Sequence, residues 1–127
     1  MIVAGIGCRR GTSAECVIEA LHGALARSGI AQSKLGALAT SADKHDEFGI
    51  FEAAKRLSLS IVLVPQTALQ KMSMHTLTFS ARVRSLKGVN CLAEAAALAA
   101  AGPGARLIAP RHATSVATCA LAEGGAP

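Results

Sequence analysis

An apolar run that ends in glycine and leads within a few residues into a helix constrains the fold more than any other feature of this sequence. Residues 1–7, MIVAGIG, predict a short buried strand. Residues 12–29, TSAECVIEALHGALARSG, predict a helix that Thr12 or Ser13 caps and that Gly29 ends. A strand that turns directly into a helix is the basic unit of an α/β domain.

Strand and helix patterns continue to alternate along the chain. LSIVLVP is an apolar, β-branched run, which we expect to be a central strand of the sheet. VNCLAEAAALAAAG predicts an alanine-rich helix that Asn90 caps. The remaining predictions are a strand at 35–40, helices at 50–58 and 66–72, a mobile loop at 72–88, and strands at 105–110 and 115–123 joined by the turn RHAT. The pattern predicts an α/β layered domain with largely parallel strands and at least one antiparallel strand.

Length and composition limit which kinds of protein this chain can be and which functions it can have. The 127 residues suit one domain, 1–127, and no apolar run reaches the ~20 residues of a membrane span. The N-terminus lacks the pattern of a secretion signal, so we expect a cytoplasmic protein with no membrane partner. Four widely spaced cysteines form no CxxC pair, so no metal site is predicted.

The net charge of +5 favours an anionic partner. Nucleic acid is not the favoured one, because aromatic residues for base stacking make up only 2% and no helix-turn-helix or zinc-finger spacing is present. A small polyanion fits better.

The corner GIGCRRGT is the first candidate site. Gly5 and Gly7 resemble the start of a dinucleotide fingerprint, but Arg10 occupies the third glycine position and no acid follows the second strand. Paired arginines at a helix start favour a carboxylate or phosphate ligand, while a plain glycine turn is the structural alternative. Cys8 lies beside these cations, which would lower its thiol pKa, although packing inside the turn is the favoured interpretation.

The loop DKHDE, residues 43–47, is the second candidate site. Lys44 could hold an anionic group, and His45, Asp46 or Glu47 could act as a general acid or base. A solvated loop that caps the next helix is the alternative. Open α/β sheets bind ligands at the carboxyl ends of their strands, so we expect both loops and Arg111 to line one cleft.

Four ordered motifs resemble the small cobalamin-biosynthesis proteins called CobE and the C-terminal domain of the two-domain CbiG proteins. They are GIGCRRGT, ATSADKHDEFG, VNCLAEAAAL, and AP followed by Arg111 and then VATCALA. The resemblance extends over nearly the whole chain.

The resemblance implies a three-layer α/β/α fold with a central mixed, mostly parallel sheet, and a role in building the corrin ring. In the anaerobic branch the two-domain proteins open a ring lactone, and the present chain resembles the stand-alone form of the aerobic branch. The implied partners are an anionic corrin-ring intermediate and other enzymes of the pathway, and no cofactor is implied.

Corrin precursors carry many carboxylates around an apolar disc, which suits a cluster of cations. Phe48 and Phe51 could contact such a ring, although core packing is the favoured interpretation. Carrier of an intermediate, hydrolase and nucleotide-binding module remain as alternatives, and catalysis stays undecided. The candidate ligand-binding residues are Gly5, Gly7, Cys8, Arg9, Arg10, Thr12, Lys44 and Arg111, and the candidate catalytic residues are His45 and Glu47.

Overall fold

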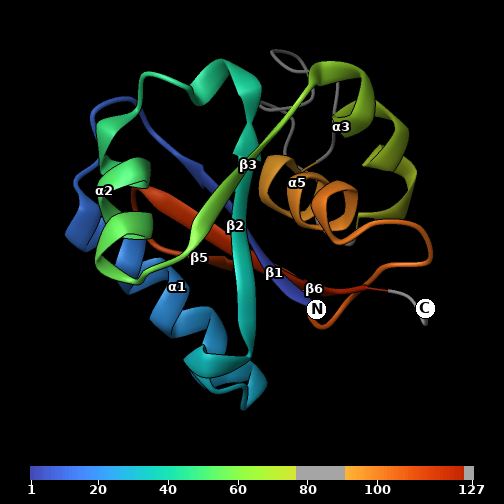
Figure 1. The fold of residues 1–127 in the computed structure, drawn as a ribbon, viewed down its shortest axis with the longest axis horizontal. Coiled ribbons are helices and arrows are strands. Elements are labelled where there is room, and N and C mark those ends of the chain that lie inside the picture. The colour runs from blue at the N-terminus through green and yellow to red at the C-terminus, as the bar shows by residue number, and fades with distance from the viewer. Residues whose placement is uncertain (77–90, 125–127) are drawn as a thin grey trace.

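The chain forms an open, mixed sheet of six strands in the computed structural model, which describes residues 1–76 and 91–124 (Figure 1). The sheet order is β3-β2-β1-β6-β4, and β5 also pairs with β6. The strands are β1 (Ile2–Cys8), β2 (Leu35–Ser41), β3 (Ser60–Val64), β4 (Arg106–Leu107), β5 (His112–Ala113) and β6 (Ala117–Glu123). The helices are α1 (Ala14–Ser28), α2 (Phe48–Arg56), α3 (Gln66–Met72) and α5 (Leu92–Ala101), with short 3-10 turns at Gln32–Lys34, Ala42–Lys44 and Ser73–His75.

Only β6 runs against the other five strands. β1 pairs in parallel with β2, and β2 pairs in parallel with β3. β6 is antiparallel to β1, to β4 and to β5, so β4 and β5 run in the same direction as β1. The mixed, mostly parallel sheet is therefore confirmed.

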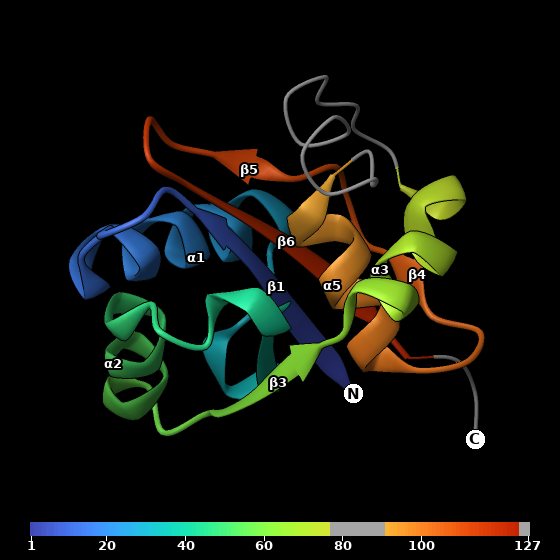
Figure 2. The ribbon, with the colours of Figure 1, turned by 90° about the horizontal axis from the view of Figure 1, so that it is seen from above.

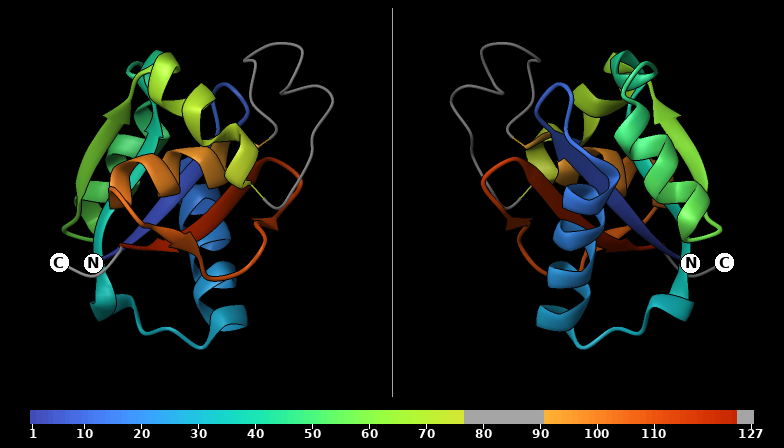
Figure 3. Two further views of the ribbon diagram at one scale, coloured as in Figure 1. Left: turned by 90° about the vertical axis from the view of Figure 1, so that its right-hand side faces the viewer. Right: turned by 90° about the vertical axis from the view of Figure 1, so that its left-hand side faces the viewer.

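Helices cover both faces of the sheet and make three layers (Figures 1 and 3). α1 and α2 pack on one face, where Val17, Leu21 and Ile50 bury against Ile6 and Leu38. α3 and α5 pack on the other face. Because the core is built from alanine and short aliphatic side chains, helices and strands approach closely.

The strand Ser60–Val64 lies at the edge of the sheet, which corrects the expectation that it is central. Val62 and Leu63 are 37% and 38% exposed, whereas Val64 is 3% exposed. A continuous apolar run is typical of a buried strand, but here the two glycine- and alanine-rich strands β1 and β2 are the ones buried on both sides.

Several further element boundaries differ from the sequence predictions. The strand predicted at 105–110 is only Arg106–Leu107, and the strand predicted at 115–123 begins at Ala117. α2 begins at Phe48, two residues before the predicted start. The N-cap of α5 is Cys91 rather than Asn90. Arg111 to Thr114 do not form a simple turn, because His112 and Ala113 pair with Cys119 and Thr118 as strand β5.

The predicted loop at 72–88 falls mostly outside the described residues, which resume at Cys91. The predicted short helix at Gln66–Met72 is confirmed as α3. In residues 1–76 and 91–124 no helix combines the length and the apolar character that crossing a membrane requires.

Candidate functional site

The carboxyl ends of β1 and β2 bring the two candidate loops together. The Lys44 Nζ donates a hydrogen bond to the Cys8 carbonyl oxygen at 2.9 Å. The Gly11 amide donates to Glu47 Oε2 at 3.0 Å, and Arg10 forms an ion pair with Asp46 at 3.6 Å. The expectation that GCRRG and DKHDE share one edge of the sheet is therefore confirmed.

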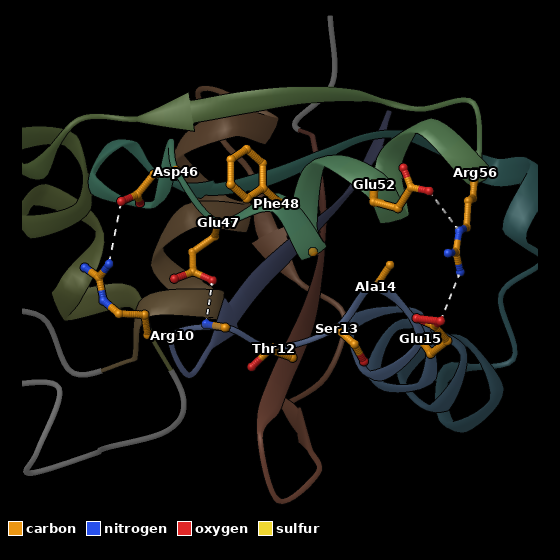
Figure 4. A pocket seen from close by; sticks show the side chains of 12 residues that line it. Arg10, Thr12, Ser13, Ala14, Glu15, Asp46, Glu47, Phe48, Glu52 and Arg56 are labelled. Carbon is orange, nitrogen blue, oxygen red and sulfur yellow. Dashed lines mark hydrogen bonds and ion pairs between the residues drawn. The ribbon is translucent and has the colours of Figure 1, made fainter.

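A groove of about 480 Å³ lies where the two loops lead into α1 and α2 (Figure 4). The first turn of α2 packs closely against the residues that precede α1, since a Cβ at Gly49 would collide with the Thr12 carbonyl oxygen. Ser13 caps α1 by accepting a hydrogen bond from the Cys16 amide. The groove is lined by residues 10–15, 46–49, 52 and 56.

Glu47 is the most buried acid of the groove, with an exposed fraction of 5%. One carboxylate oxygen, Oε2, accepts the Gly11 amide hydrogen, and Gly11 adopts a left-handed φ of 79° that suits glycine. The other oxygen accepts no hydrogen bond from a described residue. No fully buried side-chain oxygen among those residues lacks a partner, so Oε1 is open to the groove.

The groove carries more acids than bases. Arg10 pairs with Asp46 at one end, and Arg56 pairs with Glu15 at 3.6 Å and with Glu52 at 3.4 Å at the other end (Figure 4). With Glu47 added, four carboxylates face two guanidinium groups. The interior of the groove therefore does not attract a polyanion, and cations are accessible only at its rim.

Phe48 lies at this rim with 85% of its surface exposed, which corrects the expectation of core packing. Phe51 is 36% exposed. A phenylalanine in the first turn of a helix usually buries its ring. Here the ring stands beside the groove and offers an apolar contact to a ligand (Figure 4).

The other predicted ligand-binding residues divide into two places. Arg9 and Thr12 lie in the first loop, where the Thr12 hydroxyl donates to the Arg9 carbonyl oxygen at 2.6 Å. Lys44 is near but does not line the groove. Arg111 lies apart from the groove, beside α1, in a hollow that also contains Arg27 and His112. Neither Lys44 nor Arg111 lines this groove, so the expectation that they share a cleft stays a prediction.

The predicted catalytic residues also separate. Glu47 lines the groove, whereas His45 is exposed, and its Nδ1 lies 3.3 Å from the Ala42 carbonyl oxygen. Among the described residues no group of three His, Cys, Asp or Glu side chains could hold a metal ion.

Cys8 is not an activated thiol. Burial raises its pKa, and the charge of Glu47 raises it further, while Lys44 and a hydrogen bond with Thr12 oppose the shift. The cation that opposes desolvation is therefore Lys44, not the neighbouring arginines. The side chain packs beneath the turn against the core on the α1 face.

Gly5 and Gly7 are explained by packing. A Cβ at Gly5 would collide with the Ala93 carbonyl oxygen and would lie 2.8 Å from the Ala97 amide nitrogen of α5. A Cβ at Gly7 would lie 2.8 Å from Thr118 Oγ1. Thr40, where a dinucleotide fold places its acid, is buried and donates to the Ile6 carbonyl oxygen at 2.8 Å. These contacts argue against a dinucleotide site.

Glu94 is a buried acid that sequence analysis missed. It stands in the first turn of α5, is fully buried, and its Oε2 accepts the Arg111 amide hydrogen at 3.0 Å. The carboxylate thereby fixes the backbone that enters β5. The signal in the sequence was a lone acid inside a run of alanines. A helix that is buried on all sides tolerates a charge only where the charged group has hydrogen-bonding partners.

The protein is therefore a three-layer α/β protein. It has an open mixed sheet and a groove at the carboxyl ends of its strands. Residues 2–122 match the family model described as cobalamin synthesis G C-terminus. The chain belongs to this family of cobalamin-biosynthesis proteins.

Curated and solved relatives agree with this assignment. The chain is 33% identical over 121 residues to Protein CobE of Sinorhizobium sp., covering 95% of this chain and 79% of that protein. The crystal structure of a CobE from the vitamin B12 pathway superposes with a TM-score of 0.91 at 36% identity, covering 96% of this chain and 89% of the other.

A second solved relative is the cobalamin biosynthesis protein chiG of Agrobacterium tumefaciens. It matches with a TM-score of 0.79 at 42% identity, covering 99% of this chain and 100% of that one.

Proposed function

We propose that this chain binds an anionic corrin-ring intermediate of cobalamin biosynthesis at the rim of the groove between α1 and α2. The observation that carries the proposal is the pairing of an exposed aromatic ring, Phe48, with an exposed cation, Arg10, at the carboxyl edge of the sheet. A corrin precursor is an apolar disc bordered by carboxylates. Such a ligand needs an apolar surface and a guanidinium within reach of each other.

Arg10 is available to a ligand at low cost. Its side chain is 82% exposed, and its ion pair with Asp46 is long at 3.6 Å. Exposed ion pairs of this kind contribute at most about 1 kcal/mol, so a ligand carboxylate can replace Asp46. Arg9, which precedes Arg10 in the chain, is also exposed.

The acids that line the groove set the orientation of the ligand. Glu15, Glu47 and Glu52 repel carboxylates, so the ring lies across the rim against Phe48 rather than inside the groove. The proposal includes a role in the cytoplasm and in the aerobic branch of the pathway, where other pathway enzymes would supply and receive the intermediate; the resemblance to CobE supports it.

The direct experiment is a titration of the purified protein with a panel of polycarboxylate corrinoids, followed by ultraviolet-visible spectroscopy. Arg10→Ala should weaken binding about tenfold, which corresponds to the loss of one charge-assisted hydrogen bond. Phe48→Ala should also weaken it, because the ring loses its apolar contact.

Arg106→Ala is the matched control. Arg106 is similarly exposed, at 77%, and is also paired with an acid, Glu123, but it lies on β4, away from the groove. Its removal lowers the net charge equally and should leave affinity unchanged. Equal weakening by Arg10→Ala and Arg106→Ala would show a nonspecific charge effect and would contradict the proposed site.

A hydrolase acting on a corrinoid ring lactone is the second candidate function. It is favoured by Glu47, whose Oε2 is fixed by Gly11 while Oε1 stays open to the groove. A carboxylate held in this way can accept a proton from an attacking water.

Glu47→Gln separates the two functions, because glutamine keeps an oxygen that can accept the Gly11 hydrogen bond but cannot act as a general base. In a hydrolase this variant should bind the corrinoid with nearly unchanged affinity and lose turnover, measured as disappearance of the lactone. In a carrier the wild-type protein shows no turnover to lose.

A further inference from the structure

Strand β3 forms one outer edge of the sheet (Figures 2 and 3). β2 pairs with its inner side in parallel over all five residues, Ser60–Val64. In a parallel pair, alternate residues of a strand direct their N–H and C=O groups toward the partner, and the others direct theirs outward. The outer side of β3 therefore presents backbone donors and acceptors that no strand of residues 1–76 and 91–124 pairs with.

The two edges of the sheet differ in how they are protected against association. Native sheets avoid edge-to-edge pairing through very short edge strands, charged side chains, proline or bulges. The opposite edge consists of β4 and β5, which have two residues each, and β4 carries Arg106. β3 has five residues, none of them charged or proline, and its register with β2 is unbroken. The β3 edge thus lacks the protection that the opposite edge has.

Exposed apolar side chains gather at the β3 edge. Val62 and Leu63 point to opposite faces of the sheet, and both are exposed. Phe51 of α2 is also exposed, and it lies about 140° around the helix from Arg56, which pairs with Glu15 of α1. Phe51 therefore points away from α1. Because α1 packs on β1 and β6 while α2 packs on β3, this direction is that of the open edge (Figure 2).

The charge distribution favours a second copy of this chain as the occupant of this edge. The chain has a net charge of +5, so two copies repel each other where their charged surfaces meet. Residues 57–70, which include β3, form the longest stretch of the sequence without Asp, Glu, Lys or Arg. Two identical copies can meet here without burying like charges. Lys55, one turn after Phe51, is exposed and can keep its ammonium group in water at the rim.

We propose that two copies of this chain pair along β3 in antiparallel orientation, about a two-fold axis near Val62, the middle residue of the strand. Antiparallel strands exchange N–H···O bonds reciprocally, so this edge is complementary to its own copy. The two-fold axis joins the two sheets into one and closes the assembly at a dimer. The groove lies between α1 and α2, on the other side of α2 from Phe51, so the proposal does not depend on the function proposed for the groove.

A five-residue edge offers less surface than a permanent dimer requires, so we expect a reversible dimer with a Kd on the order of 100 μM. Sedimentation velocity of the full chain, over concentrations that bracket this value, is the test. The sedimentation coefficient should rise with concentration to that of a dimer and no further. Unfolding experiments at much lower concentrations then report on the monomer.

Val62→Lys should raise the Kd at least about tenfold, because it places two like charges directly opposite each other across the two-fold axis. Ala26→Lys is the matched control. It adds the same charge at an exposed position of α1, away from β3, and should leave the association unchanged. Circular dichroism checks that both variants keep the helix content of the unmodified chain.

Val62→Glu tests the geometry of the pairing. Alone, it should associate as weakly as Val62→Lys, but an equimolar mixture of the two variants should restore the dimer, since opposite charges then face each other. A mixture that stays monomeric would overturn the two-fold pairing. A chain that remains monomeric at millimolar concentration, association that Val62→Lys leaves unchanged, or growth beyond a dimer would each overturn the proposal as a whole.

Discussion

At position 5 the backbone of β1 approaches the backbone of α5 so closely that only glycine fits. The colliding atoms would be the Ala93 carbonyl oxygen and the Ala97 amide nitrogen, and neither can swing aside as a flexible side chain could. The glycine thus sets the distance between the central strand and the helix that covers it.

Gly5→Ala should therefore destabilise the protein by about 2 kcal/mol or more, because overpacking against backbone forces α5 away from the sheet. Gly36→Ala is the matched control on the neighbouring strand, where the added Cβ would collide with no backbone atom and only with the side chain of Met1. Met1 is 68% exposed and can move, so this change should cost little. Urea unfolding of both variants checks the prediction, and equal midpoints would contradict it.

Gly5 also shows why sequence patterns misjudge single residues. Its spacing from Gly7 and from the arginines resembles a phosphate-binding turn, and the same glycines also suit close helix packing. The deciding partners, Ala93 and Ala97, lie far along the chain. Local sequence carries no information about that distant contact, whereas the proximity of the two candidate loops follows from the parallel direction of β1 and β2 and could be anticipated.

Among the elements, β3 has the most apolar sequence and yet an exposed position. The β-branched run predicts its strand conformation correctly, because backbone preference is local. Its place in the sheet depends on which strands pair, and small residues allow β1 and β2 to take the crowded centre. The hydrophobic pattern therefore predicted that this segment is a strand, but it did not predict the position of the strand in the sheet.

The edge position predicts how lysine substitutions in β3 behave. Leu63→Lys should change the free energy of unfolding by less than about 1 kcal/mol, since the side chain is already 38% exposed. Val64→Lys should destabilise by several kcal/mol, because Val64 is 3% exposed and packs with Leu69 and Leu92. Urea unfolding measures both. A large loss for Leu63→Lys would mean that this face is covered.

For the whole molecule, three buried or half-buried thiols make stability fall at alkaline pH. Burial raises the pKa of Cys119 from 9.0 to about 12, and burial also raises the pKa of Cys8 and Cys91. The unfolded chain loses these protons near pH 9.0 while the folded chain keeps them. The stabilisation is therefore complete below pH 9.0 and is lost as pH rises through about 12.

We expect the titration of Cys119 alone to lower the free energy of unfolding by about 1.4 kcal/mol for each pH unit between 9.0 and about 12. Urea midpoints measured at several pH values in this range check the slope. Cys119→Ala should flatten the slope by this amount, and this difference isolates the thiol from lysines that titrate in the same range. An unchanged slope in Cys119→Ala would contradict the assignment.

The sequence was most informative about the architecture and the family of the whole molecule. The alternation of strands and helices predicts the layered architecture, and the order of the motifs predicts the family. The position of Arg111 could not be predicted, because it depends on β5, a two-residue strand that pairs with β6.

The position of β6 between β1 and β4 has a consequence for synthesis on the ribosome. β1 emerges early, but its hydrogen-bonding partner on that side follows much later: Gly7 and Thr118, whose side chain donates to the Gly7 carbonyl oxygen, are 111 residues apart. Until β6 emerges, β1 has an open edge, and α5 has only part of the sheet to cover. A nascent chain stalled before residue 117 should therefore lack the final core and depend on chaperones, which protect such edges.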